Sequence, residues 1–168
     1  MTHTWNYLPI TPEQEEVSQQ LAQELGISPI LCRLLAERGI QTAAAAKKFF
    51  RPQLPDLHDP FLMKDMDVAV DRLNRAMGRK ERILIYGDYD VDGTTAVALV
   101  YKFIQQFYSN IDYYIPDRYN EGYGVTTKGV DYAASTGVGL VIVLDCGIKA
   151  VEEIAYAKSK GIDFIICD

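Results

Sequence analysis

The sequence predicts an α/β fold with a doubly wound parallel sheet, preceded by a small helical N-terminal region. The chain has 168 residues, of which 48% are hydrophobic and 24% charged, as is typical of a globular protein. Four short runs rich in apolar and β-branched residues lie at 83–86, 111–115, 140–144 and 164–167. Helical patterns separate these runs, at 94–107, about 126–135 and 150–160. Near-continuous apolar strands that alternate with helices indicate a parallel sheet covered on both faces.

Short helices are expected before the strands, because Ser or Thr stands where each would begin and Gly or Pro where it would end. Their capping residues are Thr11, Ser28 and Thr42. Two such helices followed by Lys47, Lys48 and Arg51 would also suit a helix-turn-helix DNA-binding unit. No basic recognition helix stands out, so a small helical appendage is the preferred interpretation.

A Pro-rich connector and a further helix near 65–77 lead from these helices to the strands. We therefore expect two parts, a helical region with its connector at 1–60 and an α/β domain at 61–168. No apolar run approaches the roughly 20 residues that cross a bilayer. The 3 Cys residues form no C-x-x-C pair, so reduced thiols are expected. Together these observations predict a cytoplasmic protein with no membrane partner.

Carboxylates follow three of the four predicted strands. Asp88, Asp90 and Asp92 alternate after the first strand, Asp145 follows the third and Asp168 the fourth. Because ligands bind beyond the carboxyl ends of parallel strands, these side chains should lie at one edge. Two unit charges about 4 Å apart repel by roughly 4 kcal/mol at an effective dielectric near 20, so converging carboxylates need a cation. Hard oxygen ligands suit Mg²⁺ or Mn²⁺, and the cluster could hold two ions that activate water and bind a phosphoryl oxygen.

A single aspartate at a strand end is more commonly a turn residue or a helix cap. Three alternating acids after a buried strand, with Asp145 after another, favour a metal site instead. If the chain stays extended, the alternation places the three acids on one side, and Gly93 lets the backbone turn into a helix at Thr94. The net charge of -6 argues against a nucleic-acid partner. However, the acidic excess from residue 61 onward disappears when the five candidate aspartates are set aside.

The same loop fits the D-x-D-G-T motif of haloacid-dehalogenase-type phosphatases. In that alternative Asp90 would be a nucleophile that forms an aspartyl phosphate, and Asp92 would be the acid/base. Two features count against it. That family usually follows the motif with a hairpin flap, whereas 94–107 has a long helical pattern, and the second strand ends in Ile-Pro rather than Ser or Thr.

The segment at 86–96, Tyr-Gly-Asp-Tyr-Asp-Val-Asp-Gly-Thr-Thr-Ala, strongly resembles the first motif of the DHH phosphoesterase superfamily. It is most similar to RecJ-type single-stranded-DNA exonucleases. Other segments resemble this family in the same order, at 38–40, 60–71, 115–118, 121–124 and 143–147. The resemblance covers essentially the whole chain. It implies a DHH-type sheet and 5′-to-3′ degradation of single-stranded DNA in recombination and repair, with Mn²⁺ or Mg²⁺.

By motif matching, the resemblance makes Asp90, Asp92 and Asp145 the catalytic metal ligands, with Asp145 able to bridge two ions. Asp88 would support the loop, and Asp168 matches the aspartate of the motif that names the superfamily. Two histidines should follow Asp168 in that motif. The resemblance therefore predicts that the chain is an N-terminal fragment of a much longer protein, and that alone it binds metal weakly and has little nuclease activity. It also suggests a helicase and a single-strand-binding protein as partners.

Two residues of the loop after the second strand are candidate contacts to DNA. Arg118 could contact a phosphate or pair with Glu121, and Tyr123 could stack on a base, as aromatic residues do in single-strand channels. Tyr86 stands where many relatives have histidine, so no ligand role is expected there. A non-catalytic, DHH-like replication or repair scaffold is a further alternative, and the intact candidate metal ligands speak against it.

Overall fold

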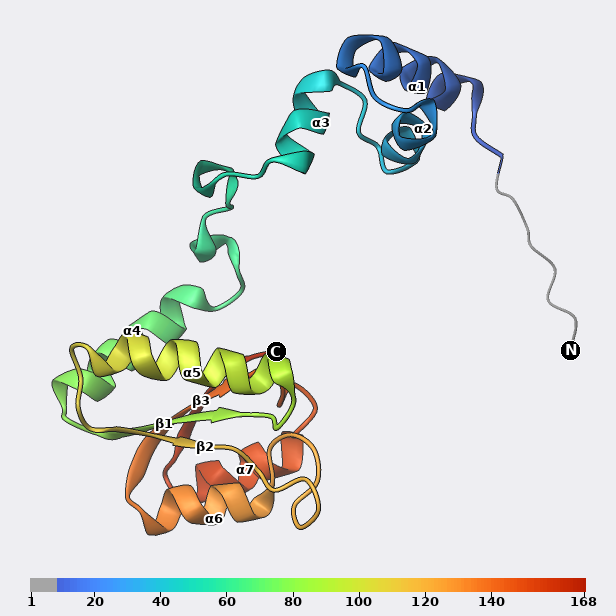
Figure 1. Cartoon of the computed structure of the whole chain (residues 1–168). Helices are drawn as coiled ribbons and strands as arrows, with labels where there is room; N and C mark the ends of the chain where they lie inside the picture. The colour runs from blue at the N-terminus through green and yellow to red at the C-terminus, as the bar shows by residue number, and fades with distance from the viewer. Residues whose placement is uncertain (1–8) are drawn as a thin grey trace, which may run out of the picture. The chain divides into compact units, whose positions relative to one another are not determined.

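The computed structural model of the chain describes residues 9–168, which divide into two compact units with the boundary between residues 59 and 60 (Figure 1). Helices dominate the described part of the first unit. These are α1 (Pro12–Leu25), α2 (Pro29–Glu37), α3 (Ala43–Phe50) and the short 3₁₀ helix η1 (Leu54–Asp56). No helix among the described residues is long and apolar enough to cross a membrane.

Two of the three predicted caps stabilise the first unit as expected. Thr11 accepts the N–H of Gln14 at 3.2 Å, and the Gln14 side chain accepts the N–H of Thr11 at 2.9 Å. Thr42 likewise caps α3, whereas Ser28 precedes α2 without a side-chain bond to it. Buried apolar side chains from all three helices then hold the unit together, namely Leu21, Cys32, Leu35 and Ala46.

The second unit is built on a parallel sheet of four strands, in the order β2-β1-β3-β4. The strands are β1 (Arg82–Gly87), β2 (Ile111–Tyr114), β3 (Val138–Leu144) and β4 (Asp163–Cys167). The chain adds β2 on one side of β1 and β3 on the other. The carboxyl ends of β1 and β3 are therefore the place where the direction of winding reverses, which is where α/β sheets bind ligands.

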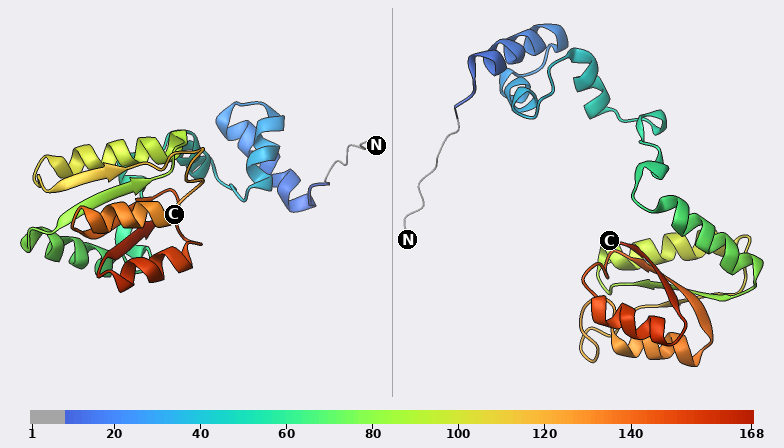
Figure 2. Two further views of the ribbon diagram at one scale, coloured as in Figure 1. Left: turned by 90° about the horizontal axis from the view of Figure 1, so that it is seen from below. Right: turned by 180° about the vertical axis from the view of Figure 1, so that it is seen from behind.

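Helices cover both faces of this sheet, as predicted (Figure 2). The helix α4 (Met66–Gly78), which the 3₁₀ turn η2 (Pro60–Leu62) precedes, and α5 (Val91–Gln105) pack on the face that carries Ile83 and Ile85. On the other face, α6 (Thr127–Ser135) and α7 (Val151–Ser159) pack around Leu84 and Tyr86. Successive residues of β1 thus point to opposite apolar layers, which explains why its sequence has no polar face.

The start of α5 differs from the prediction. The helix begins at Val91 rather than Thr94, because Asp90 accepts the N–H of Gly93 at 2.9 Å and so caps the helix. Asp92 consequently lies in the first helical turn. The expectation that the chain stays extended through Asp92 was therefore wrong, and the helix-cap interpretation is correct for Asp90.

Candidate active site

Two glycines shape the acidic loop that follows β1. A Cβ atom at Gly93 would lie 2.6 Å from the carbonyl oxygen of Asp88, and one at Gly87 would lie 2.3 Å from a methyl group of Val97. Both distances are far below van der Waals contact, so neither position has room for a side chain. The N-terminus of α5 therefore packs directly against the backbone of the loop.

This close packing buries Asp88 completely, with 0% of its surface exposed. Neither oxygen of its carboxylate has a hydrogen-bond partner among the described residues. Burying a polar group without a partner costs about 1 to 3 kcal/mol, and more for a charged one. A cation beside Asp88 would remove that cost.

Asp145 leaves the end of β3 in the left-handed conformation, with φ of 59°. Its N–H donates to the carbonyl oxygen of Cys167 at 2.9 Å, which ties it to the end of β4. Burial raises the pKa of the Asp145 carboxyl, and the negative charges of the other four candidate aspartates raise it further. All five candidate aspartates thus lie at the carboxyl ends of the strands, where the other four affect the pKa of Asp145.

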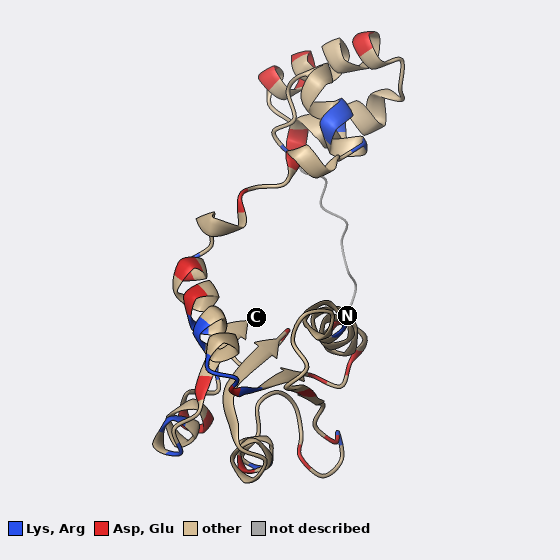
Figure 3. Cartoon of the chain, turned by 90° about the vertical axis from the view of Figure 1, so that its left-hand side faces the viewer, with Lys and Arg blue, Asp and Glu red and all other residues tan. Residues whose placement is uncertain are grey.

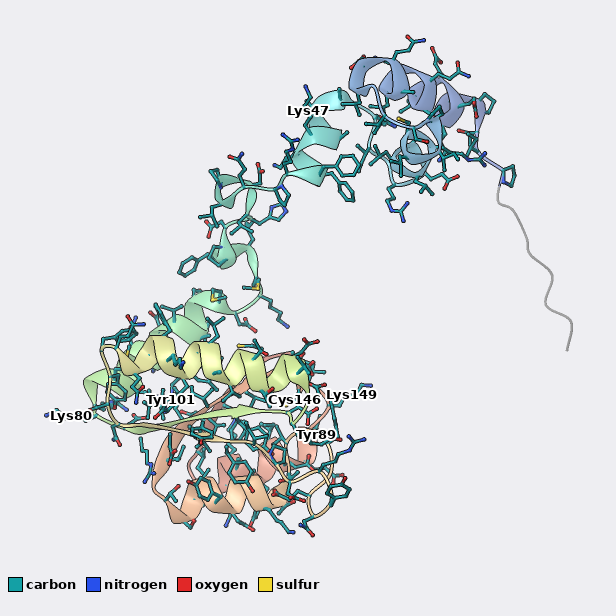
Figure 4. All side chains as sticks on the ribbon, in the orientation of Figure 1. Lys47, Lys80, Tyr89, Tyr101, Cys146 and Lys149 are labelled. Atoms are coloured by element: carbon teal, nitrogen blue, oxygen red, sulfur yellow. The ribbon has the colours of Figure 1, made fainter. Side chains whose placement is uncertain are left out.

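Asp168 and Asp92 also lie at this edge of the sheet. Asp168 accepts the N–H of Ile148 at 2.9 Å, so it links the end of β4 to the loop after β3. Asp92 and Asp145 line an open pocket of about 400 Å³, with a largely apolar wall formed by Thr95, Ala96, Leu99, Leu144 and Cys167. In Figure 4, Tyr89, Cys146 and Lys149 lie at this end of the sheet, whereas Lys80 lies at the opposite end.

The donor set fits a hard divalent cation in its chemistry. All five groups are carboxylates, which Mg²⁺ and Mn²⁺ prefer, and buried Asp88 lacks any other partner. As they are oriented, however, no three His, Cys, Asp or Glu side chains of residues 9–168 form a group that could hold a metal ion. Asp90, for example, uses one oxygen to cap α5.

The loop between β2 and α6 lies beside the carboxylates and is held by Glu121. This side chain accepts the hydroxyl protons of Tyr114 at 2.8 Å and Thr126 at 3.1 Å, and the N–H of Asp117 at 3.0 Å. Burial opposes ionisation of Glu121, but these hydrogen bonds outweigh it and lower its pKa. The ionised carboxylate therefore joins the two ends of the loop.

Tyr86 braces the same loop from β1. Its hydroxyl donates to the carbonyl oxygen of Gly124 at 2.9 Å and accepts the N–H of Thr126 at 3.2 Å. Burial raises the pKa of Tyr86 to about 12. Its ring fills the space beside Gly129, where an added Cβ would lie 2.6 Å from a ring carbon. Tyr86 thus has a structural role, because it holds the loop between β2 and α6 against β1.

Arg118 does not pair with Glu121, so that alternative was wrong. Its guanidinium lies over the ring of Tyr89, 5.4 Å from the centroid. The ring of Tyr123 meets Tyr89 edge-on, with centroids 6.1 Å apart. Tyr89 was missed from the sequence, although an aromatic residue between two aspartates of the loop was a usable signal. In the view of Figure 3, the Lys and Arg positions of the described residues are spread along the ribbon among Asp and Glu positions.

Comparisons with known proteins agree with this geometry. Residues 82–168 match the model of the DHH family, N-terminal domain. The chain is 41% identical over 157 residues to the single-stranded-DNA-specific exonuclease RecJ of Bacillus subtilis, covering 94% of this chain and 20% of that protein. It is 32% identical to the RecJ of Escherichia coli, covering 92% of this chain and 26% of the relative. The chain thus spans about a fifth to a quarter of the length of these relatives.

Solved structures show the same fold. A crystal structure of exonuclease RecJ bound to manganese superposes with a TM-score of 0.58 and 30% identity, over 63% of this chain and 27% of that one. The structure of RecJ in complex with Mn²⁺ from Thermus thermophilus gives a TM-score of 0.68 at 22% identity, over 90% of this chain and 20% of that one. The haloacid-dehalogenase alternative finds no support, because a helix begins at Val91 where that family has its flap.

Proposed function

The chain belongs to the DHH family, and we propose that its acidic edge supplies metal ligands for the hydrolysis of phosphodiester bonds in single-stranded DNA. The observation that carries this proposal is Asp88, which is fully buried and has no hydrogen-bond partner among the described residues. It lies at the carboxyl ends of the strands, where Asp90, Asp92, Asp145 and Asp168 also lie. The relatives are named as single-stranded-DNA-specific exonucleases, and the solved RecJ structures hold manganese.

Each candidate residue has a role in this proposal. Asp90, Asp92 and Asp145 would hold Mn²⁺ or Mg²⁺, with two ions in the complete site, and Asp88 and Asp168 would support them. When bound, such ions lower the pKa of a water molecule and stabilise charge on the phosphoryl oxygens. The close approach of α5 to the loop, through Gly93, also directs the positive end of the helix dipole toward the site.

The side chains of the neighbouring loop would receive the DNA. Arg118 is exposed and forms no ion pair with any described residue, so its charge is available to a phosphate. Tyr123 is 64% exposed and can stack on a base. Because Asp and Glu outnumber Lys and Arg in the chain, 23 against 17, bound cations and these few contacts must offset the repulsion between the acidic edge and a polyanion.

Three further proposals rest on the family resemblance and not on the geometry of the site. We propose 5′-to-3′ polarity in recombination and repair, in the cytoplasm. We also propose that a helicase and a single-strand-binding protein act with this protein, since a single-strand-specific enzyme needs separated strands. The boundary near residue 60 would separate a helical domain from the DHH domain.

A nucleotide-release assay tests the proposed function. Incubation with Mn²⁺ and a labelled single-stranded oligonucleotide should release nucleotides, and Asp90→Asn or Asp145→Asn should abolish the release. The rate is expected to be low, because the chain spans about a fifth of the length of its Bacillus subtilis relative. Asp71→Asn, on the exposed side of α4, is the matched control. Release that persists without divalent ions, or in both site variants, would overturn the proposal.

A further inference from the structure

We propose that Tyr89 is a positioning residue that holds Arg118 and Tyr123 together as one contact surface for single-stranded DNA. This inference rests on the proposed function and concerns its substrate side. Tyr89 lies in the acidic loop between Asp88 and Asp90, whereas Arg118 and Tyr123 come from the loop between β2 and α6. The ring of Tyr89 therefore links the loop of the candidate metal ligands to the loop of the candidate DNA contacts.

The contacts of Tyr89 have the geometry that each type of interaction favours. The guanidinium carbon of Arg118 lies 5.4 Å from the centroid of the Tyr89 ring, within the distance at which a ring attracts a cation. The ring of Tyr123 is nearly perpendicular to that of Tyr89, at 89°, with centroids 6.1 Å apart. Tyr89 is half-buried, whereas its two partners are exposed. Figure 4 shows Tyr89 at the carboxyl end of the sheet.

Acids close to Arg118 in the sequence are already engaged by other groups. Asp117 accepts the N–H groups of Tyr119 and Asn120, at 2.9 and 2.8 Å. Glu121 accepts three hydrogen bonds from other residues. The guanidinium is thus placed by an uncharged ring, and its hydrogen-bond donors remain available. The planar guanidinium is well suited to bind phosphate oxygens through two hydrogen bonds.

Tyr123 is held at two points, its neighbouring backbone and its ring. The next residue, Gly124, accepts the hydroxyl proton of Tyr86 at 2.9 Å, which anchors the backbone beside Tyr123 to β1. The ring of Tyr89 then supports the Tyr123 side chain. A long Arg and an exposed Tyr normally lose side-chain entropy when they bind a ligand, and holding them in advance reduces that cost. The contribution of Tyr89 should therefore appear in the affinity for DNA.

Oligonucleotide binding tests this role. The dissociation constant of a fluorescent single-stranded oligonucleotide is measured by anisotropy with Ca²⁺, for the wild-type chain and variants. Tyr89→Phe keeps the ring and should bind as the wild type does. Tyr89→Leu should bind roughly two- to five-fold more weakly, the loss expected for an exposed cation–π contact. Arg118→Ala should also bind more weakly. In the double variant, Tyr89→Leu should reduce the affinity by a smaller factor than it does in the wild-type background, because the contact with Arg118 is already lost.

Two controls separate the possible outcomes. Tyr113→Leu breaks a similar edge-on pair, Tyr101–Tyr113, on another part of the domain and should leave DNA binding unchanged. If Tyr89→Leu fails to fold, Tyr89→Met serves as the disruptive variant. Wild-type affinity in the Leu or Met variant, or full additivity with Arg118→Ala, would overturn the role of Tyr89 and leave the proposed function intact. Absence of DNA binding by the wild type would overturn both.

Discussion

The α-carbon of Gly93 lies so close to Asp88 that a Cβ atom there would be 2.7 Å from the Asp88 nitrogen and 2.6 Å from its carbonyl oxygen. Gly93→Ala should therefore push α5 away from the acidic loop. Overpacking of this kind costs about 1 to 3 kcal/mol, which urea unfolding would detect. Gly78→Ala is the matched control, because nothing lies within 4 Å of its Cβ position in α4 and Ala favours a helix, so it should not destabilise the protein.

Asp88→Asn should stabilise the protein when divalent ions are removed. The substitution takes away a buried charge that has no hydrogen-bond partner, so the free energy of unfolding in EDTA should rise by about 1 kcal/mol or more. The same variant should gain less stability than the wild type when Mn²⁺ is added. Equal unfolding midpoints of the two proteins in EDTA would show that the charge of Asp88 is satisfied in some other way.

Tyr86→Phe should change the alkaline stability profile. Burial raises the pKa of Tyr86 to about 12 in the folded protein, above the value near 10 expected when unfolded. The hydroxyl therefore contributes stability below pH 10 that is lost as the pH rises toward 12. The variant should be less stable at pH 8 by about 1 to 2 kcal/mol, because Gly124 and Thr126 lose their partner.

Urea unfolding at several pH values measures this effect. Between pH 10 and 12 the wild type should lose more stability than Tyr86→Phe, so the difference between them should shrink. Parallel losses in the two proteins would mean that Tyr86 does not titrate with the raised pKa.

Glu121→Gln should have the opposite pH signature. Hydrogen bonds from Asp117, Tyr114 and Thr126 overcome the effect of burial and lower the pKa of Glu121 from 4.5. A carboxyl whose pKa is lowered by folding stabilises the fold at pH values above its pKa in the unfolded chain. This contribution is lost as the pH falls through its pKa in the folded protein. The wild type should therefore lose more stability than Glu121→Gln between pH 5 and 3. Identical acid unfolding of the two would contradict this role.

The sequence predicted the sheet well because buried parallel strands leave a clear signal. The apolar run at 140–144 became β3 with only two extra residues, and Thr42 caps α3 as predicted. The gathering of Asp88, Asp145 and Asp168 at one edge followed from strand direction alone. The start of α5 was misplaced, because Asp90 can both bind a cation and cap a helix, and a sequence pattern does not separate these uses.

Contacts between loops could not be predicted from the sequence. The ring of Tyr89 meets Arg118 and Tyr123 across about thirty positions of sequence, and only the three-dimensional fold brings them together. The partners of Glu121 show the same limit. Arg118 is close to Glu121 in the sequence and was a reasonable ionic partner for it. In the structure, the Glu121 carboxylate instead accepts hydrogen bonds from the hydroxyl groups of Tyr114 and Thr126.

Calorimetric titration of Mn²⁺ into the chain tests the acidic edge most directly. The wild type should bind Mn²⁺ at neutral pH. Asp90→Asn and Asp145→Asn should each weaken the binding by at least about ten-fold, which is 1.4 kcal/mol, and Asp71→Asn should leave it unchanged. Failure of the wild type to bind Mn²⁺ at millimolar concentration, or equal binding by the wild type and both site variants, would show that these carboxylates do not form a metal centre.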